Sequence, residues 1–421
     1  MACPGLLLLF ALFAGLMMTR RLPALLALPM LALSIGLLDG LNAGMNSAQL
    51  LDLLGNRILG DGSVGMARSM VVAFAGGCLG QVVLRQGIAG ALVSRAAEYA
   101  GDRQMLLCLG MLLVVAINFS ALSGVGAILM VGNLVLPIMI GAGVSPERAG
   151  VTMLFGIALG GLVNPLALQI YVDLLKVPLQ VCLSFCVGYY LLLWLAALAF
   201  VLWGCRRPTF AWAAQPEPGV SSKLGMPALI TPILPLILMG PARTPPLLAI
   251  ATAIVYGCLI SQPRRSVNNL TQALIEGIRD VAPMVALFVG LGMVLEAIQI
   301  PQTREILAPV LRWGIPHSGA GYILYFTLLA PLSTYRGPLT LYGLGAGLAA
   351  LMVSELPVEA VLAAFLCLGQ FQSICDPTCT HAVCVGQVVH QSPEKLAKIA
   401  APYVWIFVAS GLTWVVLWRG I

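Results

Sequence analysis

Two ionisable residues lie in short polar breaks between apolar runs, in positions where they could bind an anion and a cation. Arg336 lies in the break at 333–338, and Asp376 precedes Pro377 in the break at 373–378. A charge in hydrocarbon costs at least about 2.5–3.5 kcal/mol, so each side chain is expected to face a partner or a cavity. A planar guanidinium group suits a carboxylate, and a carboxylate at a helix break suits sodium or a proton.

Both residues also have structural interpretations. The sequence allows three interpretations of Arg336: it binds a substrate carboxylate, it forms a permanent internal ion pair with Asp376, or it lies at a different depth from the expected midplane. Asp376 carries a coupling cation or caps the half-helix that follows it, because Asp is a favoured N-cap and Pro a favoured first helical residue. The sequence leaves these alternatives open, and the two roles of Asp376 are compatible.

Short polar residues and glycines surround these breaks and the matching breaks of the first half. They can bind substrate oxygens or sodium, and they can equally satisfy backbone groups that the breaks leave free. His381, one turn beyond Asp376, either relays a proton or is a satisfied buried histidine. The predicted substrate-binding set is Ser120, Ser123, Gly124, Asn164, Ser333, Thr334, Arg336, Gly337 and Thr378, and the predicted ion-coupling set is Asp376, Asn164, Thr380 and His381.

No metal site or enzyme is predicted. Cys375, Cys379, His381 and Cys384 match no compact zinc spacing and do not share one helical face. No histidine is placed to activate Ser123 as the nucleophile of an intramembrane protease. The only cofactor expected is the coupling ion, Na⁺ or H⁺.

The composition indicates an all-α polytopic membrane protein. Hydrophobic residues make up 60% of the 421 residues and charged residues 9%, against about 25% charged residues in soluble domains. With about 20 residues per span, there is room for ten or more spans. The net charge of +6 is spread over loops, which indicates the positive-inside pattern of a protein in a lipid bilayer and no nucleic-acid partner.

The breaks occur in the same order in both halves. Paired interruptions of this kind point to the binding site of a transporter, although apolar sequences can also align by chance. We therefore predict two repeats of about five spans, with a cytoplasmic linker between them. The breaks lie at 120–126 and 160–165 in the first half and at 333–338 and 373–378 in the second; the predicted units are 1–204, 205–225 and 226–421.

The distribution of Lys and Arg predicts that the N-terminus lies outside and that the loop with Arg20 and Arg21 is cytoplasmic. An odd number of spans per half inverts the second repeat. The segments 104–142 and 318–353 then fit best as re-entrant hairpins, and each repeat also carries a discontinuous helix. Asp280 is expected at the cytoplasmic mouth of its span, in a solvated or interfacial role.

Motifs that contain glycine or proline occur at 20–28, 36–40, 87–92, 124–131, 136–139 and 143–146. In these motifs the chain resembles the ion transporter superfamily, and within it the gluconate and citrate–proton symporter families. The resemblance implies inverted repeats, elevator-type movement, homodimers, the bacterial inner membrane, and organic anions moved with protons or sodium. It covers most of the chain, although relatives often have Ser-Asn-Thr-like triplets at the tips.

Together these features predict a symporter, a secondary active transporter for a sugar acid, citrate or a dicarboxylate. One alternative is a sodium/proton antiporter of the same superfamily, in which Asp376 is the ion site and Arg336 its partner. Another is a membrane scaffold subunit that transports nothing. The chain has no phosphate-binding loop, so it is not expected to hydrolyse ATP by itself.

Overall fold

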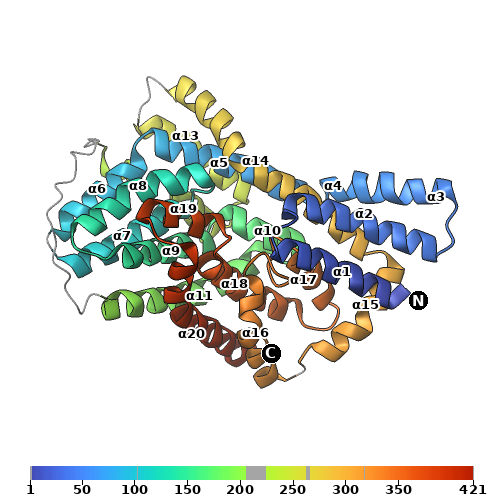
Figure 1. Cartoon of the computed structure of the whole chain (residues 1–421). Helices are drawn as coiled ribbons and strands as arrows, with labels where there is room; N and C mark the ends of the chain where they lie inside the picture. The colour runs from blue at the N-terminus through green and yellow to red at the C-terminus, as the bar shows by residue number, and fades with distance from the viewer. Residues whose placement is uncertain (1, 102, 205–223, 262–265, 317, 421) are drawn as a thin grey trace.

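The computed structural model describes residues 2–101, 103–204, 224–261, 266–316 and 318–420, and these residues form helices joined by turns and loops (Figure 1). The first half contains α1 (Ala2–Met18), α2 (Ala24–Asn42), α3 (Ser47–Asp52), the π-helix η1 (Leu53–Asp61), α4 (Gly62–Val64), α5 (Ala67–Arg85), α6 (Ile88–Ala100), α7 (Gln104–Phe119), α8 (Val125–Gly141), α9 (Pro146–Leu162), α10 (Pro165–Leu175) and α11 (Leu179–Gly204).

The second half follows a similar order of long and short helices. It contains the 3-10 helix η2 (Met226–Ile230), α12 (Leu234–Met239), α13 (Pro246–Ser261), α14 (Ser266–Ile298), α15 (Pro301–Gly314), α16 (Gly319–Leu329), the 3-10 helix η4 (Ala330–Ser333), α17 (Gly345–Met352), α18 (Val358–Cys375), α19 (Thr380–Val389) and α20 (Pro393–Arg419).

The sequence marks several helix starts by a polar cap followed by proline. Asn164 precedes Pro165 at α10 and its side chain accepts a hydrogen bond from the backbone N–H of Leu166. Ser392 precedes Pro393 at α20 and accepts from Lys395. A proline at the first helical position loses no hydrogen bond, so these pairs set where the helices begin.

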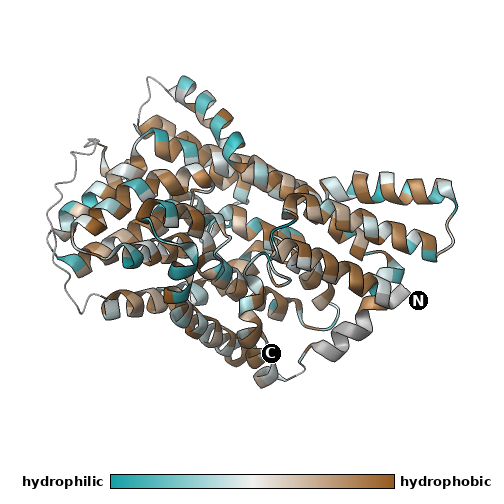
Figure 2. Ribbon diagram, viewed as in Figure 1, coloured by the Kyte–Doolittle hydropathy of each residue, from teal (hydrophilic) through white to brown (hydrophobic). Residues whose placement is uncertain are grey.

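Apolar helices long enough to cross a membrane confirm the polytopic class, and apolar residues cover most of the ribbon (Figure 2). The described residues contain six such helices, or seven if the pair α9 and α10, bent by 54°, is one span. This is fewer than the ten full crossings that we expected from the sequence. Several remaining apolar helices, such as α7 and α8, are only 16 and 17 residues long.

Both expected helix breaks are present, with different geometry. In the first, α9 ends at Leu162 and α10 begins at Pro165 with a sharp bend. In the second, α18 ends at Cys375 and α19 begins at Thr380, and the two together form an apolar span of 32 residues without a bend above 40°. The sequence therefore located both interruptions, but not the difference in bending.

The helices pack as two groups, and each half of the chain contributes to both. In the first helix group, α1–α5 and α12–α15, the long α14 packs along α5 and α2. In the second helix group, α6–α11, α16 and α18–α20, α7 packs on α9, α18 on α20, and α19 on α8, whereas α17 packs mainly on α14 of the first helix group. Helix α10 packs on α5 and joins the two groups.

Glycine pairs let α5 and α14 approach closely within the first helix group. A Cβ atom added to Gly77 would overlap the backbone of Gly277, and one added to Gly62 of the neighbouring α4 would overlap the backbone of Met293. Small residues at such crossings allow backbone contact between membrane helices. We infer that this crossing is rigid.

The two broken helices run in opposite directions along α20. Glu147, in the first turn of α9, pairs with Lys395 in the first turn of α20, with a distance of 2.7 Å. Glu359, in the first turn of α18, pairs instead with Arg419 in the last turn of α20 at 3.7 Å. Helices α9 and α18 therefore begin at opposite ends of one helix.

Three expectations about local structure were wrong or fall outside the described residues. The second part of the hairpin expected at 318–353 is only partly helical: residues 338–344, which include Pro338 and glycine, form turns and loop, and α17 begins only at Gly345. The helical stretch at 47–64 was not expected. Most of the linker predicted at 205–225 lies outside the described residues.

Candidate functional site

Asn164 at the first break is buried and uses its whole amide group to tie the break to the neighbouring hairpin. Its Oδ1 accepts a hydrogen bond of 3.0 Å from the backbone N–H of Leu166. Its Nδ2 donates to the backbone oxygens of Phe119 and Leu122, at 3.0 and 3.2 Å. These two oxygens lie at the end of α7 and in the turn that leads to α8, so the hydrogen bonds of Asn164 stabilise the tip of this hairpin.

Asp376 at the second break is fully buried, and only one of its two carboxylate oxygens is bonded. Oδ1 accepts hydrogen bonds from the backbone N–H of Thr378 at 2.8 Å, from the Thr378 hydroxyl at 2.7 Å, and from the backbone N–H of Tyr335 at 3.0 Å. Oδ2 is buried and has no hydrogen-bond partner among the described residues. A buried charged oxygen without a partner is costly, so Oδ2 is the candidate position for a coupling ion at this break.

Arg336 lies at the second tip, close in sequence to the Tyr335 backbone that binds Asp376. Its side chain is half-buried, and no ion pair joins it to Asp376 within the part of the chain described. Tyr335 and Arg336 both have a φ of +54°, in the left-handed region. Each such residue without a glycine's freedom costs about 1–2 kcal/mol, so the surrounding contacts must hold this turn.

Arg20 brings a second cation to the same tip. Its guanidinium carbon lies 5.9 Å from the ring centroid of Tyr335, within the range of a cation–π contact. The sequence analysis placed the loop of Arg20 on the cytoplasmic face and the tip near the midplane. The structure puts Arg20 and the tip in contact, which the sequence analysis did not anticipate.

Most hydroxyl groups of the predicted site bond to nearby backbone. The hydroxyls of Ser333 and Thr334 donate to the carbonyls of Ala330 and Pro331, at 2.7 and 2.6 Å. The Ser120 hydroxyl lies 2.7 and 3.1 Å from the carbonyls of Ile117 and Pro232. The structural interpretation therefore holds for these three. The Ser123 hydroxyl is buried without a partner among the described residues.

The first tip is packed against an acid that the sequence analysis expected in a solvated or interfacial role. Gly124 has a φ of +92°, and a Cβ atom there would lie 3.3 Å from the Cβ of Asp280 on α14. A Cβ atom on Gly126 would lie 3.2 Å from a carboxylate oxygen of Asp280. Gln81 donates to that carboxylate at 2.6 Å. Asp280 thus belongs to the contact between the first tip and the first helix group.

Gly337 at the second tip is required for a different reason. A Cβ atom on Gly337 would overlap the backbone oxygens of Leu332 and Thr334, so this position requires close approach of two backbone segments. Farther along, Thr380 is the first residue of α19. His381 Nδ1 lies 3.1 Å from the Ser373 hydroxyl, as expected of a satisfied histidine.

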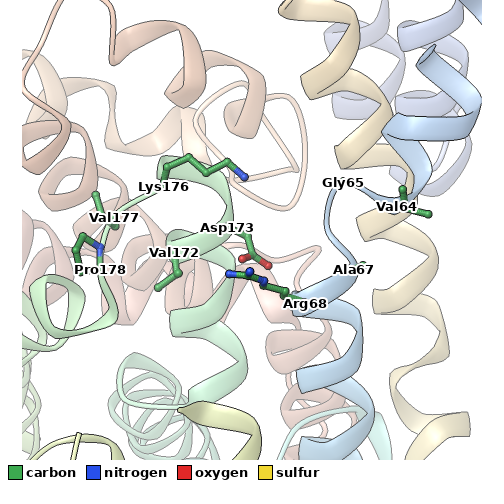
Figure 3. A pocket seen from close by; sticks show the side chains of 9 residues that line it. All are labelled: Val64, Gly65, Ala67, Arg68, Val172, Asp173, Lys176, Val177 and Pro178. Atoms are coloured by element: carbon green, nitrogen blue, oxygen red, sulfur yellow. The ribbon is translucent and has the colours of Figure 1, made fainter. Parts of the chain in front are cut away.

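A separate cavity of about 650 Å³ lies where the start of α5 meets the end of α10 (Figure 3). Figure 3 shows the side chains of Arg68 and Asp173 between the two helices, with Lys176 farther along α10. None of the predicted site residues lines it. The sequence analysis missed both cations, although each lies close to an apolar run. The cavity is lined by Val64, Gly65, Ala67, Arg68, Val172, Asp173, Lys176, Val177 and Pro178.

The fold is that of known membrane transporters. No protein-family model and no curated protein sequence matches the chain. It is similar to the solved YdaH transporter of Alcanivorax borkumensis, with a TM-score of 0.60 and 16% identity over 89% of each chain. It is also similar to MtrF of Neisseria gonorrhoeae, from a class of antimetabolite efflux pumps, with a TM-score of 0.61 and 12% identity over 94% of this chain and 95% of that one.

Proposed function

We propose that the protein is a secondary active transporter that moves a small organic anion across a bacterial inner membrane, coupled to Na⁺ or H⁺. The observation that carries this proposal is the buried, unpartnered Oδ2 of Asp376. The similarity in fold to two transporters supports the general class.

The two breaks differ in whether the side chain at the break can donate hydrogen bonds to the hairpin tip. At the first break, the amide of Asn164 donates two hydrogen bonds to carbonyls of the hairpin tip. At the second break, Asp376 offers an acceptor instead, and a carboxylate oxygen cannot bond to carbonyl oxygens without a cation or proton between them. A sodium ion or a proton bound at Oδ2 would therefore complete the contact between this break and its tip.

Arg336 and Arg20 supply the positive charge for an anionic substrate. Neither forms an ion pair with another described residue, and both lie at the second tip, where Tyr335 binds Asp376. A sugar acid, citrate or a dicarboxylate would present carboxylates to the Arg336 fork. Coupling follows because anion and cation would both stabilise the same turn.

The opposite directions of α9 and α18 support two inverted repeats, and the two helix groups support elevator-type movement. In that movement the second helix group, which carries both breaks and both tips, slides along the crossing of α5 and α14. A homodimer through the first helix group would hold that crossing fixed in the membrane.

A sodium/proton antiporter is the second candidate, because the free Oδ2 of Asp376 would equally serve an ion exchanged without an organic substrate. The version in which Arg336 is the internal partner of Asp376 is not supported, since no ion pair joins them. Export is a further option, since MtrF is from a class of efflux pumps.

Uptake into proteoliposomes tests the proposal. Labelled gluconate, citrate, succinate and malate are supplied with an imposed sodium or proton gradient, in both directions. We expect gradient-driven transport of at least one acid, lost in Arg336→Ala and Asp376→Asn. The exposed residues Arg304 and Asp61 provide the matched controls Arg304→Ala and Asp61→Asn.

Other outcomes separate the alternatives. Sodium/proton exchange that needs Asp376, without transport of any acid, would move the protein to the antiporter class. A scaffold subunit would show neither activity, and alanine substitutions at both tips and both breaks would leave its assembly unchanged.

A further inference from the structure

The cavity between α5 and α10 holds two cations that have no ion-pair partner within the described ranges. Arg68 and Lys176 are exposed and reach the cavity from different helices (Figure 3). The other lining residues are small or apolar, apart from Asp173. With two cations and one carboxylate, the lining carries a net charge of +1.

Asp173 is already occupied by neighbouring donors. Its Oδ2 accepts hydrogen bonds from the backbone N–H of Ser69 at 3.0 Å and from the Ser69 hydroxyl at 2.7 Å. Its Oδ1 accepts from Gln169 Nε2 at 2.9 Å, and the residue is buried. Asp173 therefore holds α10 against α5 and leaves both cations for another partner.

The charge of Arg68 is placed where the helix dipole opposes it. Arg68 lies in the first turn of α5, where the helix dipole disfavours positive charge, and the N-cap Met66 makes no side-chain cap. Lys176 is the C-cap of α10, with a φ of +56°, a conformation that is common at helix C-termini, where the dipole favours a cation. An anion bound between them would offset the cost at Arg68.

We propose that this cavity is an anion-binding site, separate from the tips and breaks, which takes a small molecule carrying a carboxylate or phosphate group. Arg68 and Lys176 bind the anionic group from two sides, and the first N–H groups of α5 add the positive end of the helix. The valines and Pro178 accept an apolar part of the ligand. The volume falls within the range of about 300–1,000 Å³ of small-molecule sites.

The position of this site gives the bound anion a second effect. Arg68 belongs to the first helix group and Lys176 to the second, so one ligand bridges the groups. Binding stabilises the present arrangement of α10 on α5, whichever ligand the tips carry. This inference does not depend on transport activity.

Isothermal titration calorimetry tests the site directly. The full chain with Arg336→Ala is placed in phosphatidylcholine nanodiscs at low salt, so that anion binding through Arg336 is removed. Citrate and inorganic phosphate are the two probes. We expect saturable binding of at least one probe, weakened about tenfold or more by Arg68→Gln and by Lys176→Gln, because each removes a charge-assisted contact.

Matched variants separate charge from folding. Arg103→Gln and Lys398→Gln remove exposed cations elsewhere and should bind like the background protein. Lys176→Arg keeps the charge and should keep binding, and unchanged melting temperatures without ligand show that the variants are folded. Absence of binding by both probes, or binding in Arg68→Gln and Lys176→Gln as tight as in the background protein, would overturn the proposal.

A lipid headgroup could supply the same phosphate chemistry. Nanodiscs containing phosphatidylglycerol distinguish it from a soluble ligand. Probe binding that is unaffected by this lipid assigns the site to a soluble anion. The lipid could also compete with the probe in the background protein but not in Lys398→Gln. The competition would then depend on Lys398, which would contradict a site at Arg68 and Lys176.

Discussion

The two helix breaks occupy matching places in the two halves but are completed in different ways. At the first break, the amide of Asn164 accepts one hydrogen bond and donates two, all with backbone groups of the protein. Asp376 accepts three hydrogen bonds at Oδ1 and, among the described residues, none at Oδ2. In the proposed function, this exchange of one NH₂ group for an oxygen means that a cation must complete the contact at the second break.

The two hairpin tips also differ in what holds them in place. The first is short, running from the end of α7 at Phe119 to the start of α8 at Val125. It rests on Asp280 of the first helix group. The second has turns from Thr334 to the start of α17 and holds Tyr335 and Arg336 in left-handed conformations. We infer that the first tip is fixed by protein contacts and the second by ligands.

The largest effect is expected when the fixed break is given a carboxylate. Asn164→Asp removes both donors to the first tip and buries an unpaired charge, which costs about 3–5 kcal/mol of stability. Thermal and denaturant unfolding in detergent measure the change. A variant as stable as the wild type in the absence of any cation would break the comparison, because the first break would then not depend on its amide.

The second prediction concerns the break that lacks a donor. In the wild type, sodium or protons at about 100 times the dissociation constant should stabilise the protein by about 2.7 kcal/mol. In Asp376→Asn the amide can donate in place of the cation, so this dependence should vanish. Unfolding temperatures measured across sodium concentration and pH check it. Equal cation dependence in both proteins would place the ion elsewhere.

The third prediction concerns the charge at the second tip. Arg336→Ala should raise the KM for the transported acid by about 10- to 100-fold, since hydrogen bonds to charged groups contribute about 1.5–3 kcal/mol. Arg336→Lys keeps the charge but loses the fork and should fall between the two. Concentration-dependent uptake into proteoliposomes measures KM. An unchanged KM in Arg336→Ala would remove Arg336 from the substrate site.

The smallest predicted effect tests the packing of the first tip. Gly124→Ala should cost about 1–2 kcal/mol of stability, because alanine disfavours a positive φ and its Cβ would press on Asp280. Gly161→Ala is the matched control, since a Cβ atom there meets no atom within 4 Å. Denaturant unfolding compares the two. If Gly124→Ala is no less stable than Gly161→Ala, the tip is not fixed as described.

The sequence predicted the class of protein and the breaks, because these depend on local chemistry. Apolar runs of helical length indicate membrane helices, and Asn164-Pro165 and Asp376-Pro377 mark helix starts wherever they occur. It also indicated that Asn164 and Asp376 correspond. It could not show that the hydroxyls of Ser120, Ser333 and Thr334 donate hydrogen bonds to nearby backbone carbonyls, since a free and a bonded hydroxyl look alike in sequence.

Only the tertiary structure decided which groups meet. That Asp280 lies on the first tip, that Arg20 lies over Tyr335, and that Arg68 and Lys176 share a cavity are contacts between segments distant in the chain. Composition and periodicity fix each helix alone, whereas its neighbours follow from how all the helices pack together. The amino-acid sequence thus set the acid at the second break, and packing alone left its second oxygen without a hydrogen-bond partner in the described part of the chain.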